Sequence, residues 1–281
     1  MVELDYTRRV DAHYGRRDFA REILDTLRAA GKNLNALRPD DVAQLTHLNP
    51  RGKIATLELA KAAGLSHGMH VLDLGSGLGG PARTLAADIG CRVTGLDLTA
   101  ELVRTATILT ERTGLAGQVT FQQGDALDMP FPEASFDAVW TEQFTMHIPD
   151  KSRLYVQIHR VLRRGGRYAF REFMAGEVQP LLYPVGWARD PSISFLDEPD
   201  RVRSLIKRVG FDERHWEDVT PRPVVASQTA WSTDSSLPTG PQLFQGADYE
   251  NNRRNMARNY AEDRLSLVQG VFERVEPAHI P

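Results

Sequence analysis

Several features that mark particular classes of protein are missing from this chain of 281 residues. It has one cysteine, Cys91, so it cannot form an internal disulfide, and we expect this residue to be a small core side chain at the start of a strand. It has no run of the roughly 18 apolar residues that a membrane-spanning helix needs. Its N-terminus also lacks the layout of a signal peptide. We therefore expect a cytoplasmic protein that does not associate with a membrane.

The chain also lacks a large net charge, and it lacks metal-binding motifs. The formal net charge of −3 argues against nucleic acid or an anionic membrane as the main partner. None of the eight histidines stands in an H-x-x-x-H or H-E-x-x-H pattern, and the single cysteine has no second thiol beside it. We therefore expect no metal site.

The hydrophobic pattern divides the chain into a helical beginning and a longer alternation of strands and helices. Helices are expected at residues 16–30 and 53–63, with a short one after Arg38. Strands are expected at 69–74, 92–97, 118–122, 136–141, 166–173, 213–219 and 265–272. The helices between them are expected at 80–88, 99–113, 151–162, 199–209 and 248–262. This alternation predicts an α/β fold with a seven-stranded, mostly parallel sheet and helices on both faces.

The same pattern predicts three regions. Residues 1–64 form an N-terminal helical cap segment, and residues 65–220 together with 265–281 form the main domain. Residues 221–264 interrupt the alternation before the last strand with a proline-containing, polar stretch and a helix. A connection of this length is too long for an ordinary loop, so we interpret it as a helical lid over a binding site.

The segment His70-Val-Leu-Asp-Leu-Gly-Ser-Gly-Leu-Gly-Gly is the most informative part of the chain. It predicts a buried strand that ends in a tight glycine turn, where a backbone without Cβ atoms lies close to a ligand. The turn alone leaves two cofactors open. Its glycines fit the dinucleotide pattern G-x-G-x-x-G, and together with Asp73 they also fit D-x-G-x-G-x-G, the usual S-adenosylmethionine loop.

Two acidic residues and one missing pair of residues favour S-adenosylmethionine, whereas a third acidic residue does not discriminate between the two cofactors. Asp97, at the end of the second strand, suits ribose hydroxyls in either cofactor. Asp73 is a carboxylate that would repel a pyrophosphate but would favour a cationic amino acid and sulfonium. Asp125 follows the third strand, where a carboxylate suits the adenine amino group. No tyrosine is followed four residues later by lysine, the pair expected in short-chain hydride-transfer enzymes.

Four motifs in order carry a resemblance to a known family. They are VLDLGSGLGG, VTGLDL, GDALDMPF and FDAVWTEQFTMHIPD, followed by VLRRGGRYAFREF. The segment from about residue 69 to 174 resembles class I S-adenosylmethionine-dependent methyltransferases. The likeness is strongest to small-molecule enzymes of the ubiquinone/menaquinone and sarcosine/dimethylglycine methyltransferase type. It implies a Rossmann-like fold and S-adenosylmethionine as the cofactor.

The resemblance also assigns cofactor-binding positions. Asp73 and Gly75 would lie beside the methionine portion of the cofactor. The backbone at Gly77 and Gly79 would leave room for that portion. The remaining assignments are Asp97 to the ribose, Leu98 to an adenine face, Asp125 with Ala126 to the adenine edge, and Thr141 to a place near the methionine amino group. Asp125 has a competing interpretation as a turn cap, and Leu98 has one as a core residue.

Methyl transfer from a sulfonium is an in-line displacement, in which a base is needed only if the acceptor must lose a proton. His147 is the first candidate base because the pKa of histidine lies near neutrality, and Glu172 is the second. Each has a structural alternative: His147 can cap the next helix, and Glu172 can form a salt bridge with an arginine.

The candidate substrate-binding residues lie mainly in the parts of the chain where such families diverge. They are Tyr6, Tyr14, Gln143 and Phe244, with Glu142, Trp231, Leu243 and Tyr249 as further possible pocket residues. The arginines at 253, 254 and 258 are most simply a solvated helix face.

The sequence thus predicts an enzyme that moves a methyl group from S-adenosylmethionine to an N, O or C nucleophile of a small molecule. We expect its setting to be bacterial secondary or cofactor metabolism. Two alternatives stay open, an NAD(P)-dependent oxidoreductase and a methyltransferase-fold protein that uses S-adenosylmethionine without methyl transfer. A homodimer is also possible.

Overall fold

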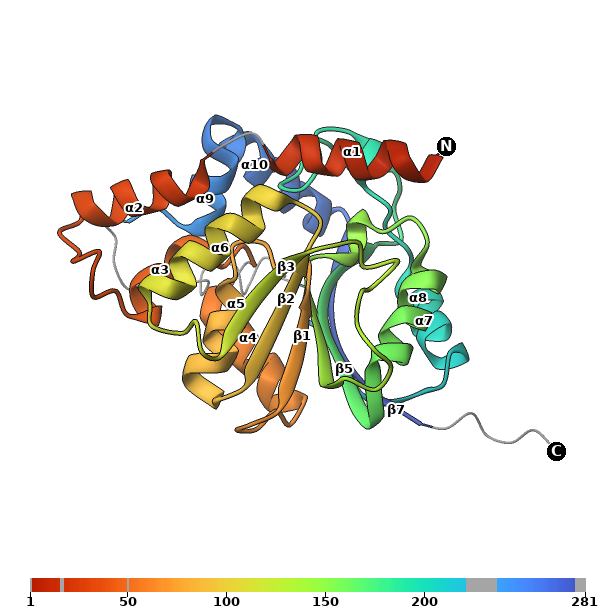
Figure 1. Ribbon diagram of the computed structural model, residues 1–281. Coiled ribbons are helices and arrows are strands. Elements are labelled where there is room, and N and C mark those ends of the chain that lie inside the picture. Colours follow the sequence, from red (N-terminus) through yellow and green to blue (C-terminus); the bar gives the residue numbers. More distant parts are fainter. Residues whose placement is uncertain (1, 16–17, 50, 221–236, 276–281) are drawn as a thin grey trace.

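A computed structural model describes residues 2–15, 18–49, 51–220 and 237–275, with the side chains of residues 2–6 left out. The described chain forms one sheet between layers of helices (Figure 1). The seven strands of the sheet are β1 (His70–Leu74), β2 (Arg92–Asp97), β3 (Val119–Gln123), β4 (Phe136–Glu142), β5 (Leu162–Ala175), β6 (Phe211–Asp218) and β7 (Leu265–Arg274). Their order is β3-β2-β1-β4-β5-β7-β6, and only β7 runs antiparallel to its neighbours. The predicted α/β fold is confirmed.

Each face of the sheet has its own hydrophobic core. On one face, α7 (Lys151–Val161) and α8 (Pro199–Arg208) pack Leu154, Ile158 and Ile206 against β4, β5 and β7. On the other face, α4 (Gly52–Ala62) and α5 (Gly80–Thr84) pack against Val71 and Trp140 of β1 and β4. A single π-helical turn, Leu85–Ile89, continues α5. Cys91 is fully buried in this second core, as the sequence predicts.

The N-terminal region and the insertion supply the remaining helices. These are α1 (Val2–Tyr14), α2 (Phe19–Ala29), α3 (Pro39–Thr46), α6 (Ala100–Arg112), α9 (Gly240–Gln245) and α10 (Tyr249–Ala261). The sequence analysis missed α1, whose polar residues outweigh its apolar ones. It also placed the start of β5 too late, because this strand begins directly where α7 ends. No helix among the described residues is long and apolar enough to cross a membrane.

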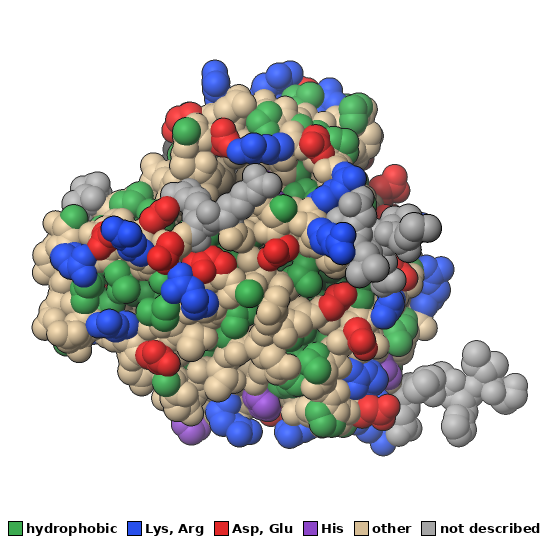
Figure 2. Space-filling model, turned by 45° about the horizontal axis from the view of Figure 1, so that its top comes forward, with side chains coloured by type: hydrophobic (Ala, Val, Ile, Leu, Met, Phe, Trp, Pro, Cys, Tyr) green, Lys and Arg blue, Asp and Glu red, His purple; other side chains and the backbone are tan. Residues whose placement is uncertain are grey.

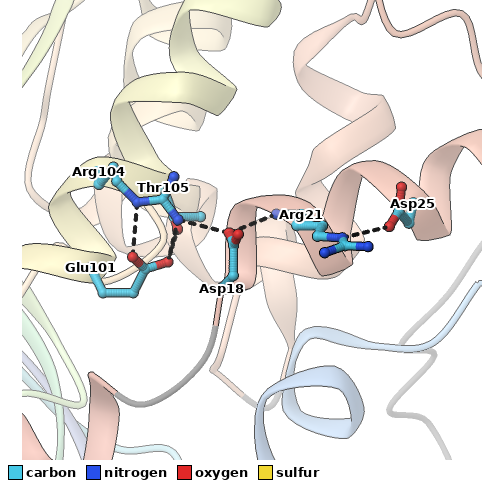
Figure 3. A network of polar contacts seen from close by, with 6 residues as sticks. All are labelled: Asp18, Arg21, Asp25, Glu101, Arg104 and Thr105. Atoms are coloured by element: carbon cyan, nitrogen blue, oxygen red, sulfur yellow. Dashed lines mark hydrogen bonds and ion pairs between the residues drawn. The ribbon is translucent and has the colours of Figure 1, made fainter.

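Charges of both signs are mixed on the surface that lies toward the viewer in Figure 2. One group of them joins the N-terminal region to the main domain (Figure 3). Asp18 caps α2 by accepting a hydrogen bond from the backbone N–H of Arg21, and it also accepts one from Arg104 of α6. Glu101 holds the same arginine in place from within α6. The beginning of α2 is thereby positioned on the helix that follows β2.

The helix α10 of the insertion is fixed to the segment between β5 and α8 by one buried amide. Asn259 is fully buried and accepts a hydrogen bond from the backbone N–H of Leu182 at 2.8 Å. Its Nδ2 donates to the carbonyl oxygen of Leu182 at 3.0 Å. Asn255, one turn earlier, donates to the carbonyl of Pro184. The orientation of the 180–190 segment therefore depends on α10.

We expect Asn259→Ala to lower the free energy of unfolding by about 1–3 kcal/mol, because it leaves the N–H and the C=O of the half-buried Leu182 without their partners. Urea denaturation followed by circular dichroism would measure this loss. Asn251→Ala is the matched control, since Asn251 lies on the same helix and is exposed. Equal stability of the two variants would contradict the proposed anchoring role of Asn259.

Candidate functional site

A cavity lies at the carboxyl ends of β1, β2 and β4, beneath α1 and α9. This is the edge of a parallel sheet where ligands of α/β proteins bind. Ten of the sequence-predicted site residues line it, namely Tyr14, Gly75, Gly77, Asp97, Leu98, Asp125, Ala126, Gln143, His147 and Phe244. Four others, Asp73, Gly79, Thr141 and Glu172, lie near it without lining it. The side chain of Tyr6 and the whole of Trp231 fall outside the described residues.

The three glycines of the turn after β1 have different environments. All three have a positive φ, of 66° at Gly75, 51° at Gly77 and 74° at Gly79. A Cβ at Gly77 would meet no atom closer than 3.9 Å, whereas one at Gly75 would meet the ring of Phe144. A Cβ at Gly79 would meet Phe121 and Arg83. The close approach of a ligand to the backbone is therefore best placed at Gly77, and Gly79 is required by packing.

Asp97 joins the end of β2 to this turn. Its Oδ2 accepts a hydrogen bond from the backbone N–H of Gly77 at 2.8 Å, and its Oδ1 accepts one from Thr99 at 2.9 Å. The carboxylate is buried, and burial raises its pKa above the ordinary value. Each carboxylate oxygen has capacity for a second donor, so the group can still accept the two hydroxyls of a ribose.

Two further buried carboxylates make this end of the sheet acidic. Burial, followed by the charges of Glu142 and Asp97, raises the pKa of Asp73 well above its usual range. Glu142 accepts hydrogen bonds from Thr56, Trp140 and Asn49, yet burial raises its pKa as well. Three acidic groups so close together favour a cationic ligand. The sequence predicts Glu142 as a possible pocket residue but not the donors that fix it, of which Asn49 and Thr56 come from the N-terminal region and Trp140 from β4.

Several buried polar atoms around the glycine turn have no hydrogen-bond partner among the described residues. They are Oδ2 of Asp73, Oγ of Ser76 and Nε2 of Gln143. Such atoms are costly unless a ligand or water completes them. Gln143 also has a positive φ of 55°, which is unusual for a residue other than glycine and marks local strain. The arrangement fits a polar, cationic molecule with a ribose, as S-adenosylmethionine is.

Asp125 combines the two roles that the sequence left open. Its Oδ1 accepts a hydrogen bond from the backbone N–H of Leu127 at 2.8 Å, which caps the turn after β3. The same residue and Ala126 line the cavity. Leu98 likewise packs against an apolar cluster and lines the cavity.

His147 and Tyr14 form a buried hydrogen-bonded pair in the cavity wall. The hydroxyl of Tyr14 lies 2.8 Å from Nε2 of His147, and Nδ1 of the same ring lies 2.9 Å from the carbonyl oxygen of Ile193. A carbonyl only accepts, so Nδ1 carries the proton and Nε2 accepts from the phenol. Burial lowers the pKa of His147 to about 4, and it raises the pKa of Tyr14. The imidazole is therefore neutral near pH 7 and presents a basic nitrogen.

Glu172 supports the loop that carries these residues from behind. Its Oε2 accepts hydrogen bonds from the backbone N–H groups of Phe144 and Thr145, at 2.9 and 3.0 Å. The side chain is 1% exposed, and burial raises its pKa to about 7. Thr141 is also buried and contacts the hydroxyl of Tyr168. Neither residue lines the cavity, although Oε1 of Glu172 has no hydrogen-bond partner among the described residues.

The part of the cavity beyond His147 is apolar and aromatic. Phe173 stacks on Trp187 with ring centroids 4.6 Å apart, and Phe244 stacks on Phe19 at 4.8 Å. Met146, Met256 and Val10 complete this wall. The sequence analysis missed Phe173 and Trp187. The long segment between β5 and α8 was a signal that could have drawn attention to Trp187.

The other expected pocket residues of the insertion lie away from the cavity. Leu243 packs on the cluster that contains Phe19, and Tyr249 does not line the cavity. The three arginines at 253, 254 and 258 are exposed on α10. Among the described residues, no group of three or more histidine, cysteine, aspartate or glutamate side chains is arranged to hold a metal ion.

Comparisons with known proteins point to methyltransferases. A family model described as a methyltransferase domain matches residues 72–170. Sterol 24-C-methyltransferase ERG6B of Gibberella zeae is 34% identical over 185 residues, which are 64% of this chain and 49% of that relative. The chain thus spans about half the length of this relative. Methyltransferase GfsG of Streptomyces halstedii is 27% identical over 241 residues, 82% of each chain.

Solved structures extend the likeness to nearly the whole fold. Geranyl diphosphate C-methyltransferase from Streptomyces coelicolor A3(2) matches 96% of this chain and 98% of its own, with a TM-score of 0.69 and 17% identity. These comparisons do not favour the alternative of an NAD(P)-dependent oxidoreductase. The matched model shows a methyltransferase domain at residues 72–170, which carries the ordered motifs and the strand ends of the cavity, and the fold is that of class I S-adenosylmethionine-dependent methyltransferases.

Proposed function

We propose that this protein transfers a methyl group from S-adenosylmethionine to a nucleophile of a small molecule, with His147 as the base. One observation carries the proposal. A single cavity brings the Asp97–Gly77 end of the sheet together with the neutral, buried imidazole of His147. We further propose that the protein acts in the cytoplasm, and that α9 and α10 of the 221–264 insertion are a lid over the cavity.

The donor end of the cavity would hold and orient S-adenosylmethionine. S-Adenosylmethionine supplies a methyl group that is already activated by its sulfonium charge. Asp97 would accept the ribose hydroxyls, the Gly77 backbone would allow close approach, and the carboxylates of Asp73 and Glu142 would favour the positive charge. Asp125 and Ala126 would contact the adenine. The apolar walls exclude water, which leaves the acceptor as the available nucleophile.

The acceptor end removes a proton. The acceptor hydroxyl or carbon acid gives its proton to the oxygen of Tyr14, and Tyr14 passes its own proton to Nε2 of His147, as the new bond to the methyl group forms and the bond from methyl to sulfur breaks. The hydrogen bond from Nδ1 to Ile193 keeps the ring in the basic tautomer and orientation. Tyr14 donates to the same Nε2, so its hydroxyl lies where it can pass the acceptor's proton to His147 or orient the acceptor. An amine acceptor would need no base, so the pair favours an acceptor that must be deprotonated.

We expect His147→Ala to lower kcat for methyl transfer at least 100-fold, because general bases contribute factors of this size. Transfer of radiolabelled methyl from the donor to an acceptor found by screening would measure it. The Kd for S-adenosylhomocysteine should stay within twofold. His159→Ala is the matched control, since His159 lies beside Phe211 on the α7 face and does not line the cavity. An unchanged kcat in His147→Ala would rule out the base.

We expect Asp97→Asn to raise the Kd for S-adenosylhomocysteine at least tenfold, measured by isothermal titration calorimetry. The amide has one acceptor oxygen in place of two, so it cannot accept from the N–H of Gly77, the N–H of Thr99 and two ribose hydroxyls. Asp128→Asn is the control, because Asp128 is exposed and does not line the cavity. Absence of S-adenosylhomocysteine binding by the unmodified protein would contradict the proposed function itself. Donor binding without label transfer to any acceptor would favour the alternative that S-adenosylmethionine is used without methyl transfer.

We propose that Glu172 is a positioning residue, which revises the expectation that it is a second candidate base. Its folded-state pKa of about 7 lies above the ordinary value of 4.5, so the folded chain binds this proton more tightly than the unfolded chain. The resulting stabilisation is complete below pH about 4.5 and is lost as the pH rises through about 7. Glu172→Gln keeps an acceptor for both backbone N–H groups and removes the titration.

We therefore expect the free energy of unfolding of the unmodified protein to fall between pH 5 and pH 8 relative to Glu172→Gln, by about 1–3 kcal/mol. Urea denaturation of both proteins at the two pH values gives this difference, and other titrating groups cancel in it. A difference that does not change with pH would show that Glu172 is already ionised in the folded protein at pH 5.

A further inference from the structure

A second cavity lies directly beside the first, on the side of α1 and α10. Its volume is about 490 Å³, within the range of small-molecule sites. Tyr14, Gly186, Phe244 and Gln245 line both cavities, so one layer of residues separates them. The proposed function uses the first cavity only and leaves the second without a role. We refer to them as the inner cavity and the outer cavity.

The acceptor end of the inner cavity suits an apolar group. Phe173, Trp187, Met146 and Met256 contribute carbon and sulfur surface there. Among the described residues that line the inner cavity there is no lysine or arginine, and its carboxylates lie at the donor end or are already hydrogen-bonded. A phosphate or carboxylate of the acceptor would lose its water there without gaining a cation.

The outer cavity is polar, and its charges are balanced. Arg189 forms an ion pair with Asp248 at 3.1 Å. Hydrogen bonds from Ser192, and to a smaller degree the charge of Arg9, lower the pKa of Asp190. Two arginines thus face two aspartates, with the hydroxyl of Ser192 and the imidazole of His13 beside them. This balance does not favour an anionic group over a neutral polar one.

A pair of amides lies where the two cavities meet. Nδ2 of Asn252 donates to Oε1 of Gln245 at 2.9 Å. Asn252 is 5% exposed, and its Oδ1 has no partner among the described residues. The Nε2 of Gln245 lies over Gly186, where a Cβ would come within 2.8 Å of it. The pair therefore offers a buried acceptor in Oδ1 of Asn252 and a donor in Nε2 of Gln245. A hydroxyl group, which donates and accepts at once, is matched to both.

We propose that the methyl acceptor is a neutral amphiphile whose apolar part occupies the inner cavity and whose hydroxyl-bearing part binds Gln245 and Asn252 in the outer cavity. This inference rests on the proposed function, because it takes the inner cavity as the acceptor site. It adds a specificity-determining pair on the insertion. It also explains why an otherwise costly unpaired amide oxygen is buried at Asn252, since the bound hydroxyl completes it.

The test uses the full chain saturated with S-adenosylhomocysteine and two amphiphiles that share one alkyl chain, n-octyl β-D-glucoside and n-octyl phosphate, below their micelle concentrations. We expect calorimetry to show the neutral glucoside binding at least tenfold more tightly than the phosphate. Asn252→Ala and Gln245→Ala should each weaken glucoside binding at least fivefold. Asn251→Ala, on the exposed side of the same helix, should leave it unchanged.

The outcomes separate this inference from the proposed function. If S-adenosylhomocysteine binds and the phosphate binds as tightly as the glucoside or more tightly, the neutral amphiphile is excluded. Glucoside binding that survives both amide substitutions would exclude the Gln245–Asn252 pair. Because Asn252 is buried, retained S-adenosylhomocysteine affinity reports that this variant is folded, and Gln245→Ala tests the same pair at a half-buried position. Loss of S-adenosylhomocysteine binding by the unmodified chain would contradict the proposed function instead.

Discussion

The rest of the site depends on the two hydrogen bonds that Asp97 accepts from the backbone of Gly77 and Thr99. Gly77 belongs to the turn after β1, and Thr99 follows β2, so one carboxylate ties together two strand ends that meet the ligand. Glycine lets the turn adopt its left-handed conformation without steric cost, and Asp97 then holds it in register with β2. Because the carboxylate is buried, the ribose hydroxyls of the methyl donor would bind it in a low-dielectric environment where hydrogen bonds are strong.

The catalytic half is positioned by a second set of constraints that acts on the loop after β4. Glu172 accepts hydrogen bonds from two backbone N–H groups of this loop. The carbonyl of Ile193 fixes the tautomer of His147, and the hydroxyl of Tyr14 donates a hydrogen bond to Nε2 of the same ring. These partners come from β5, from the segment before α8 and from α1. His147 is therefore neutral and oriented only when the N-terminal helix is packed in place. The same packing that would shield a bound donor also orients the proposed base.

The donor half could be predicted from the sequence because its residues follow strand ends at regular spacing. Asp97 is the last residue of β2, Gly77 and Asp125 follow closely after β1 and β3, and strand ends of a parallel sheet share one edge. The acceptor half could not be predicted in the same way. Trp187 stacks on Phe173 of β5 and faces the cavity from the 180–190 segment, which Asn259 of α10 holds by a long-range contact without local periodicity. Gly79 and Glu172 have the expected residue types, but neighbouring side chains direct them to packing and support.

This division has a consequence for how acceptor choice can vary. The strand ends that hold the donor are fixed by the sheet, whose register involves β1, β2 and β4 together. The walls that face the acceptor come from α1, α9, α10 and the 180–190 segment, which contact one another through Tyr14–Phe244 and Gln245–Asn252. Substitutions in these walls change the shape and polarity of the acceptor space without moving the Asp97–Gly77 contact. Acceptor specificity is therefore separable from donor binding in this fold, and the residues that carry it lie where helical periodicity and strand pattern give the least guidance.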